Sequence, residues 1–420
     1  MKLTVKNIDR TWVNLPFREV TGRNMIRELP HWTILELCQV TLDCGVTGYG
    51  ETMPFYTWME VTDASVGRAI GKCATEIMWD DSLGGGLQMA LFDAVAQANE
   101  IPIYQLFGRK IRERAPVSWW SLEMPVEDWL SECRDAIAAG YTSYKMKARP
   151  WFDQVEQMAT IDAETPDYFE IDLDFNTMLC DSAHAVRVLE KLEKYEKVKI
   201  FESPISQKDV AGNKYIRAHT NVPIAMHVGN PPLTTALEEG VCDGFVVNGG
   251  VSQVLHEANC IAEKNKVFWL QNTGSGISTV WCLHLAAVLS HARWPAVNCH
   301  NLYQHHIFEE PFHVQGGQLA IPDGPGLGYS IDWNVVEQHR IEPIPKPYPY
   351  PDLLIRVNWP SGDAVEYAHG VQYWHDFIQA FQPVFSPGVN MEVVPNDGSD
   401  DWRRRYAEAL KKPSWDMRQN

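Results

Sequence analysis

The sequence predicts an α/β protein built on a (β/α)8 barrel of the TIM type, and two observations predict this fold class. Short segments rich in β-branched and aromatic residues recur between residues 116 and 300, and segments with helical periodicity lie between them. Strand-helix alternation requires parallel strands joined by right-handed crossovers, and eight such units can close into a barrel. An open doubly wound sheet is the alternative, but no glycine-rich dinucleotide turn opens the first unit.

The expected strands are short, as buried parallel strands usually are. They cover residues 116–121, 143–148, 168–174, 197–203, 222–227, 243–248, 266–272 and 294–300. The helices expected between them include residues 126–139, 152–163, 182–195, 252–264 and 277–291. Active sites of such barrels lie at the C-terminal ends of the strands, so polar residues at those ends are the first candidates for a site.

Six of the expected strands end in polar residues that we expect to converge. These residues are Lys147, Asp174, Glu202, His227, Asn272 and His300. Lys145 shares a strand face with Lys147, and burying an ammonium group without a partner is costly, so both lysines should have acids or a substrate anion beside them. Pairing of a strand-end lysine with Asp172 or Glu170 is the alternative that involves no catalysis.

The residue types at these strand ends suit proton transfer or metal binding. Burial and a neighbouring positive charge both lower the pKa of a lysine, so each lysine is expected to make the other a better general base. Asp174 and Glu202 are either a proton-transfer pair or, with Asn176 nearby, oxygen ligands of a hard cation such as Mg2+. For each of these two acids, the alternative without catalysis or metal binding is that it caps the helix after its strand.

The composition limits the classes of function. The chain has 420 residues and a formal charge of −18, which argues against binding to nucleic acid or to an anionic membrane. It contains no apolar run long enough to span a membrane and no secretion signal at its N-terminus, so we expect a soluble, cytoplasmic protein. Nine cysteines without CxxC spacing predict reduced thiols, of which Cys299 is placed to line the site.

Several short motifs accompany the strand-end residues. They are Lys145-x-Lys147, Asp174-Phe-Asn176, Phe201-Glu-Ser-Pro204, Pro223-Ile-Ala225, Gly249-Gly-Val251 and Ile321-Pro-Asp-Gly-Pro-Gly-Leu-Gly328. In order and spacing they resemble the mandelate racemase/muconate lactonizing branch of the enolase superfamily. The resemblance implies that an α+β capping domain, completed by the C-terminal part of the chain, covers the mouth of the barrel.

The resemblance also implies a division into domains. A capping domain is expected over residues 1–115, the barrel over 116–315, a return to the cap over 316–345 and an extension over 346–420. The extension follows a proline-rich linker, and we expect in it a strand, a helix and a charged helical tail. It is expected to form an oligomer contact or an additional cover, and the protein to be a homo-oligomer.

Members of this branch remove the proton α to a substrate carboxylate and stabilise the resulting enediolate on Mg2+. By resemblance, Asp174 and Glu202 are metal ligands, Lys147 is the base and Lys145 supports it electrostatically. Asn176 and Asn272 are expected behind the ligands. Residues 14–31 and 51–60 are expected to cover the site, where Arg23, Tyr56 and Trp58 would contact the substrate.

The sequence departs from the family pattern at several places. His227 stands where relatives have a third acidic ligand, which keeps Mg2+ as the expected cofactor but makes Mn2+ or another divalent ion an alternative. Gly244 and Asn272 stand where relatives have a second acid-base group, so a reaction with one base is favoured over racemisation by two. His300 is the candidate acid, with His305 and His306 less secure.

These departures favour dehydration of an acid sugar, a small carboxylate substrate, to a 2-keto-3-deoxy product. Epimerisation or racemisation of a hydroxy acid is an alternative. Two further alternatives are an aldolase that forms a Schiff base on a strand lysine and a catalytically impaired barrel that only binds its ligand. The glycine run at 84–86 is expected to be a flexible loop rather than a phosphate site.

Overall fold

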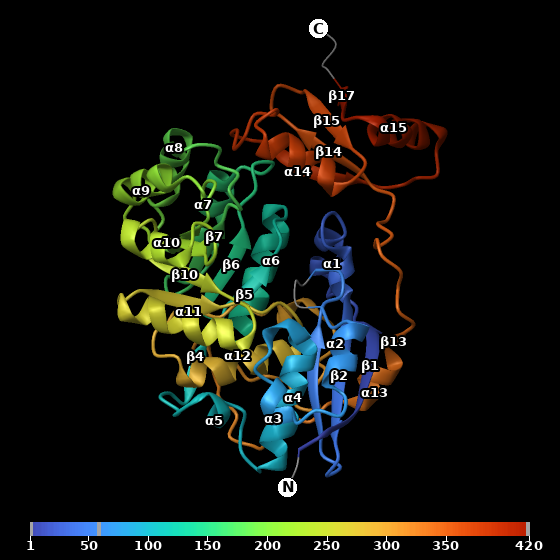
Figure 1. Cartoon of the computed structure of the whole chain (residues 1–420). Helices are drawn as coiled ribbons and strands as arrows, with labels where there is room; N and C mark the ends of the chain where they lie inside the picture. The colour runs from blue at the N-terminus through green and yellow to red at the C-terminus, as the bar shows by residue number, and fades with distance from the viewer. Residues whose placement is uncertain (1–2, 57–59, 417–420) are drawn as a thin grey trace.

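The computed structural model describes residues 3–56 and 60–416, which form a cap, a barrel and a C-terminal unit (Figure 1). The cap holds most of the first hundred residues, the barrel follows, and the C-terminal unit, residues 354–416, lies over one end of both. None of the helices in these ranges combines the length and apolar character needed to cross a membrane. All nine cysteines are free thiols.

Seven parallel strands pair in chain order to form the barrel. They are β5 (Trp119–Ser121), β6 (Ser143–Lys147), β7 (Glu170–Asp174), β8 (Val198–Glu202), β9 (Ile224–His227), β10 (Gly244–Val247) and β11 (Val267–Leu270). The sheet closes through Val297, which bridges Gln271 after β11, and Ala296, which bridges Val117 before β5. The barrel is therefore confirmed, but the eighth strand expected at 294–300 is reduced to these bridges, because Cys299 leaves the extended conformation at φ 67°.

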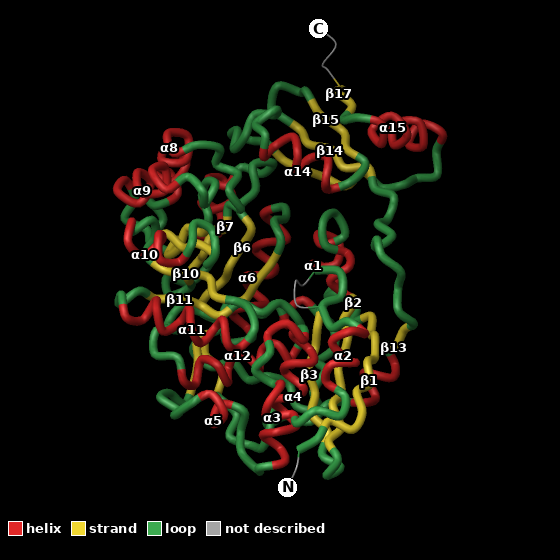
Figure 2. The backbone as a smooth tube through the Cα atoms, viewed as in Figure 1, coloured by secondary structure: helices red, strands yellow, loops and turns green. Residues whose placement is uncertain are grey.

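Helices follow the strands and cover the outside of the barrel (Figure 2). They are α6 (Val126–Ala138), α7 (Gln154–Glu164), α8 (Ser182–Leu192), α9 (Val210–His219), α10 (Leu233–Glu239), α11 (Val251–Glu263) and α12 (Gly276–Val288). Asp181 and Asp209 accept hydrogen bonds from the first turns of α8 and α9. Loop aspartates therefore cap these two helices, and Asp174 and Glu202 are not needed as caps.

The cap is an antiparallel sheet in the order β13-β1-β2-β3, packed on a buried helix. Its strands are β1 (Val5–Asn14), β2 (Ile34–Leu42), β3 (Thr47–Thr52) and β13 (Arg340–Ile341), and its helices are α1 (Glu19–Met25), α2 (Asp63–Ala69), α3 (Ala74–Ile77) and α4 (Gly85–Ala98). Short elements complete the connection to the barrel: α5 (Tyr104–Phe107), β4 (Arg114–Pro116), β12 (Gln318–Ala320) and α13 (Trp333–Gln338).

Close contact between β3 and α4 explains the glycines of both segments. A Cβ atom at Gly50 would lie 2.0 Å from the carbonyl oxygen of Gly86, so the strand and the helix touch through their backbones. Gly86 N also donates to Thr52 Oγ1 at 2.8 Å. The expectation of a flexible loop at 84–86 is wrong, because these glycines start a buried helix that must approach the sheet closely.

The C-terminal unit is a four-stranded antiparallel sheet with two helices. Its elements are β14 (Leu354–Asn358), β15 (Ala364–Tyr367), α14 (Gly370–Ile378), β16 (Asn390–Val394), α15 (Asp400–Lys411) and β17 (Ser414–Asp416), with strand order β16-β14-β15-β17. Trp151 and Phe152, which follow β6, share one hydrophobic cluster with Tyr373 and Phe377 of α14. The unit is thus packed onto the loop at the C-terminal end of β6, the end at which a barrel site forms.

Candidate active site

Two lysines and two acids meet at the C-terminal ends of β6, β7 and β8. Parallel pairing sets Lys147 level with Asp174 and Asp174 level with Glu202. The Lys145 ammonium lies 2.5 Å from Glu202 Oε2 and 3.5 Å from Asp174 Oδ2, and the Lys147 ammonium contacts Asp174. The alternative partners considered for a lysine, Asp172 and Glu170, lie further back on β7, and the contacts above give both lysines acids at the strand ends instead.

The turn after β7 brings Asn176 to the same lysine. Asn176 has φ 43° and its N–H donates to Asp174 Oδ1 at 2.9 Å, which fixes the carboxylate at the strand end. Its side chain accepts a hydrogen bond from Lys147 Nζ at 3.0 Å. A non-glycine residue with positive φ is uncommon and marks a locally strained turn at this site.

The electrostatic surroundings shift the pKa values of the two lysines in opposite directions. Burial lowers the pKa of Lys147, and the positive charges of Lys145 and Arg149 lower it further against the opposing effect of Asp174. Burial acts the same way on Lys145, but the charges of Glu202 and Asp174 outweigh it and raise the pKa of Lys145. The expected lowering of the pKa therefore holds in direction for Lys147, whereas the pKa of Lys145 is raised because its two acids outweigh burial.

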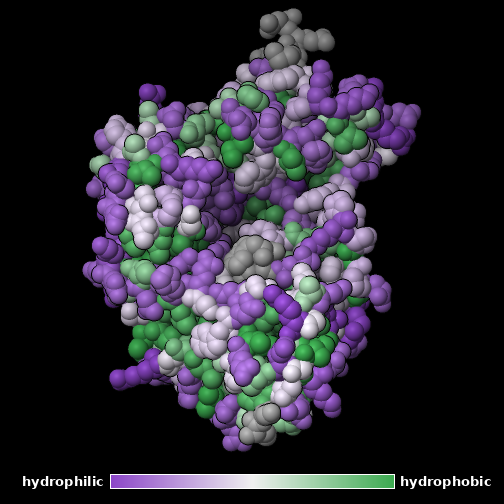
Figure 3. Space-filling model, in the orientation of Figure 1, coloured by the Kyte–Doolittle hydropathy of each residue, from purple (hydrophilic) through white to green (hydrophobic). Residues whose placement is uncertain are grey.

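A cavity of about 230 Å³ opens above these residues, and all three units contribute to its wall. Lys147 and Asn176 line it from the barrel, while Lys145 lies beneath. Tyr56 lines it from the cap as expected, and Cys299 lines it from the barrel. Trp58, expected to contact the substrate, falls outside the described residues. The molecular surface is hollowed beneath the C-terminal unit, as Figure 3 shows.

Opposite the lysines, the cavity wall is formed by Gln271 and Thr273 rather than by Asn272. Lys145 Nζ donates to Gln271 Oε1 at 3.3 Å. The expected equivalence of Gly244 with a strand-end position is also wrong, because Gly244 begins β10 and packs there against Trp294, whose ring would lie 2.4 Å from a Cβ atom. The far wall therefore carries an amide and a hydroxyl, neither of which is a base.

The site includes donors for a divalent cation. Both oxygens of the fully buried Glu202 lack a well-directed hydrogen bond, although Lys145 and His227 approach them, and Asp174 stands on the next strand. Such a pair fits a cation that takes its other ligands from water or substrate. His227 Nε2 lies 3.0 Å from Glu202 Oε1. Within residues 3–56 and 60–416, no three His, Cys, Asp or Glu side chains are grouped to hold a metal ion, and ligation by His227 stays a prediction.

Two residues expected at the site have other partners in the structure. His300 follows the left-handed Cys299, and its ring nitrogens bond to Tyr141 Oη at 2.8 Å and to Thr279 Oγ1 at 2.9 Å. Burial lowers the pKa of His300 to about 3, so the ring is neutral and held in place. Arg23 donates through Nε to Asp128 at 2.9 Å and does not line the cavity.

The cavity wall also includes Glu28 and Leu29, which lie within the cover expected at 14–31, and Trp374, which the sequence did not single out. Trp374 lies on α14 of the C-terminal unit, and the guanidinium of Arg149 stacks on its ring at 4.7 Å. Glu28 accepts a hydrogen bond at 2.8 Å from Tyr373, the neighbour of Trp374. The C-terminal unit is thus fastened to both the cap and the barrel at the edge of the cavity.

A buried ionic group holds the same edge together. Glu123, fully buried after β5, accepts hydrogen bonds from Arg27 Nη1 at 2.9 Å and from Trp151 Nε1 at 3.1 Å. Its second oxygen lies 3.7 Å from Arg149 Nε. One carboxylate therefore links an arginine of the cap to an arginine of the barrel.

Comparisons with known proteins show which family and which proteins this chain is similar to. Residues 128–335 match the family described as enolase C-terminal domain-like. The arabinonate dehydratase of Saccharolobus solfataricus is 26% identical over 275 residues, covering 61% of this chain and 71% of that protein. The D-galactonate dehydratase of Xanthomonas oryzae pv. oryzae is 22% identical over 371 residues, covering 77% of this chain and 95% of that protein.

A solved structure of similar fold is the muconate cycloisomerase from Pseudomonas fluorescens, with a TM-score of 0.67 and 21% identity. The match covers 81% of this chain and all of that one, and at this identity it supports the fold alone. The matched family region spans β6 to β11 and all four residues of the lysine and acid group. With the family match and the curated relatives, the chain belongs to the enolase superfamily, as a divergent member of the mandelate racemase/muconate lactonizing enzyme branch.

Proposed function

We propose that this protein is a lyase that removes the α-proton of a small carboxylate and dehydrates an acid sugar. The observation that carries the proposal is the position of Lys147. Its ammonium nitrogen faces the cavity beside Asp174 and Asn176, and its pKa is lowered by burial. A lysine with a lowered pKa, at the surface of a substrate-sized cavity, suits a general base.

Lys147 and Lys145 take different parts in this proposal. Neutral Lys147 accepts the α-proton at Nζ, while Lys145 stays charged and favours the negative charge that develops on the substrate. Asp174 and Glu202 would hold a divalent cation, Mg2+ by family and Mn2+ as the alternative, and such an ion stabilises a carboxylate as it gains charge. Asn176 orients Lys147 through its hydrogen bond.

The same lysine can complete the elimination. Once protonated, Lys147 returns the proton to the β-hydroxyl, the C–O bond breaks, water leaves, and the resulting enol becomes the 2-keto-3-deoxy acid. Burial raises the pKa of Cys299, which lines the cavity, to about 12, which makes its thiol a weak acid. Gln271 and Thr273 on the far wall offer no second base, which disfavours racemisation by two bases.

The relatives support the choice of substrate class. Two of the similar proteins are dehydratases named for arabinonate and D-galactonate. A cavity of about 230 Å³ also suits a small acid. We therefore propose an acid sugar as the substrate, without specifying its stereochemistry.

The test is a panel of acid sugars, including arabinonate, gluconate and galactonate, incubated with Mg2+ or Mn2+ and assayed for 2-keto-3-deoxy acids and for α-proton exchange in D2O. Lys147→Ala should lower both readouts by about 10²- to 10⁴-fold, the usual contribution of a general base. Lys199→Ala removes an exposed lysine of β8 and should leave both unchanged. Failure of the whole panel to react or exchange would refute the proposal, and borohydride trapping of a substrate on Lys147 would indicate an aldolase instead.

A further inference from the structure

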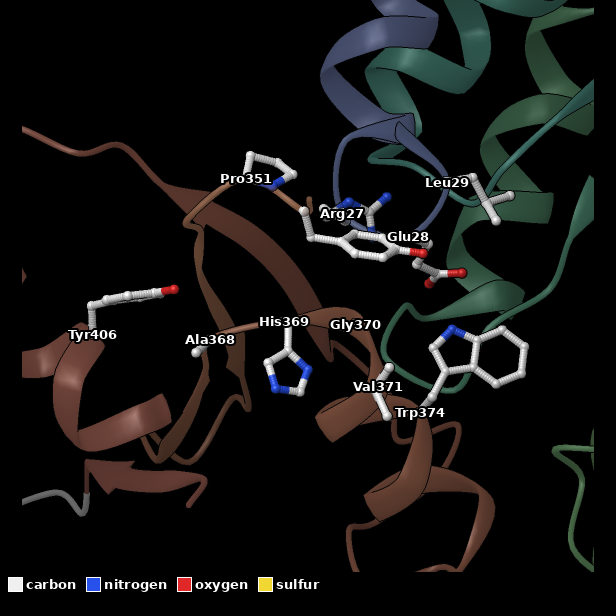
Figure 4. A pocket seen from close by; sticks show the side chains of 11 residues that line it. Arg27, Glu28, Leu29, Pro351, Ala368, His369, Gly370, Val371, Trp374 and Tyr406 are labelled. Carbon is white, nitrogen blue, oxygen red and sulfur yellow. The ribbon is translucent and has the colours of Figure 1, made fainter. Parts of the chain in front are cut away.

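A second cavity adjoins the catalytic one at the contact between the cap and the C-terminal unit. It has a volume of about 520 Å³. Glu28, Leu29 and Trp374 line both cavities. In Figure 4 these three lie on the side next to the barrel ribbon, whereas Ala368 and Tyr406 lie at the opposite end. The outer cavity therefore extends away from the reacting centre, with a shared wall of three side chains.

The walls of the outer cavity are mainly apolar and aromatic. Tyr350, Tyr406 and Trp374 supply rings, and Pro351 and Val371 supply aliphatic surface. Ring faces of this kind bind other rings, either aromatic groups or the C–H faces of sugars. The lining is thus suited to a flat, uncharged group.

The charged groups at the inner wall are already occupied. The Arg27 guanidinium donates to Glu123 Oε1 at 2.9 Å and to the Glu123 carbonyl oxygen at 2.6 Å. Glu28 accepts from Tyr373 Oη at 2.8 Å, and burial, with the nearby charge of Glu123, raises its pKa to about 8. An arginine held by an acid and a carboxyl group that is protonated at neutral pH offer no free charge to an ionic ligand.

The outer cavity belongs to a part of the chain that the family region does not contain. The family match ends at residue 335, whereas α14, which supplies Val371 and Trp374, begins at Gly370. The added unit is placed where it extends the wall of the catalytic cavity. The added unit thus sets a second cavity beside the catalytic one, with Glu28, Leu29 and Trp374 common to both linings.

We propose that the outer cavity is a subsite for an uncharged six-membered ring at the far end of the acid substrate, and that Trp374 forms the boundary between ring and reacting centre. This inference rests on the proposed function, because the acid end must occupy the catalytic cavity. The shared chemistry is a ring with an apolar face, which can be a pyranose joined to an acid sugar or a phenyl group joined to a hydroxy acid.

The experiment compares parent acids with ring-bearing partners, using the full chain with Mg2+. One arm pairs gluconate with cellobionate and melibionate, which carry a second sugar at O4 or O6, and the other pairs lactate with 3-phenyllactate. Isothermal titration is measured for each acid, kcat/KM for the sugar acids, and α-proton exchange in D2O for lactate and 3-phenyllactate, which have no β-hydroxyl to lose. In at least one arm the ring should improve binding by about tenfold, a modest gain for one buried group.

Two variants separate the outer cavity from the catalytic one. Val371→Asp places a charge at the rim, at the N-terminal turn of α14 where an aspartate suits the helix, and should bring the ring advantage to near onefold without changing the parent acid. Phe381→Asp alters an exposed residue of the same unit away from the cavity and should keep the advantage.

The outcomes distinguish the two proposals. If parent acids react but rings add nothing in either arm, or if Val371→Asp leaves the ring advantage intact, the subsite is refuted and the proposed function stands. If none of an extended set of acids, parent or ring-bearing, binds or exchanges its α-proton, the proposed function fails and the subsite fails with it.

Discussion

Replacing Glu123 by glutamine should destabilise the protein far more than an equivalent change at its surface. The carboxylate lies 2.9 Å from Arg27 and 3.7 Å from Arg149, so at an effective dielectric constant of 20 each pair attracts by about 5 kcal/mol. The cost of burying the charges offsets much of that attraction. Loss of one partner from a buried ion pair typically costs about 3–5 kcal/mol, because the remaining charge stays buried.

Glutamine keeps an oxygen that can accept hydrogen bonds from Arg27 and Trp151, so the loss should lie near the lower bound, about 3 kcal/mol. The assay is urea unfolding followed by tryptophan fluorescence and circular dichroism, with the shift in midpoint converted through the m-value. Glu19→Gln is the matched control, because Glu19 is 92% exposed and lies 3.8 Å from Arg23. That change should cost at most about 0.5 kcal/mol. Equal losses for the two variants would refute the argument that Glu123 joins cap and barrel.

Further predictions concern the cap, the pH dependence and the metal. Gly50→Ala should destabilise the protein by about 1–3 kcal/mol in thermal unfolding, since its Cβ would meet the Gly86 carbonyl oxygen at 2.0 Å, whereas Gly67→Ala, in a helix with open space around it, should be neutral or stabilising. Burial raises the pKa of Glu28 from 4.5 to about 8, so its contribution to stability is present below pH 4.5 and is lost as the pH rises toward 8. Glu28→Gln should flatten that part of the plot of urea midpoint against pH. An unchanged slope would contradict the raised pKa. Chelation by EDTA should abolish turnover and added Mg2+ restore it. His227→Asp should tighten Mn2+ binding by about tenfold in calorimetry, because it adds a carboxylate beside Glu202, and weaker binding would speak against a cation at this position.

Residues on regular strands were the part of the site that sequence could predict. Lys145, Lys147, Asp174 and Glu202 follow the two-residue period of strands, and parallel pairing brings their strand ends to one level. No loop conformation has to be known for that inference. The barrel and the central group of charges therefore follow from alternation and spacing.

Predictions failed where a strand stopped one or two residues away from its expected end. The wall opposite the lysines uses Gln271 and Thr273, so the assignment of Asn272 differs by one position, which in extended chain reverses the side-chain direction. His300 was expected at a strand end, but Cys299 turns the chain through a left-handed conformation and sends the ring toward Tyr141. Neither the end of pairing nor a positive φ at cysteine has a reliable local signal.

The place of Trp374 in the wall beside Glu28 and Leu29 could not be predicted for a different reason. Glu28 and Leu29 lie just after α1 in the cap, and Trp374 lies on a helix about 200 residues beyond Asn176. Their approach depends on how three units pack, through contacts such as Tyr373 with Glu28 and Arg149 with Trp374. Periodicity within a segment carries no information about such packing.

Because the C-terminal unit supplies part of the cavity wall, the cavity is complete only while this unit is in place. Both lysines and both acids lie before residue 203, whereas one wall of the cavity includes Trp374, much later in the chain. During synthesis, these four residues are joined to the chain before Trp374 is. A chain cut in the extended stretch between β13 and β14 would likewise keep every residue of the proposed chemistry while losing the covalent tie to its third wall. Proteolysis at this stretch is therefore a means to separate the chemical step from the enclosure in which it takes place.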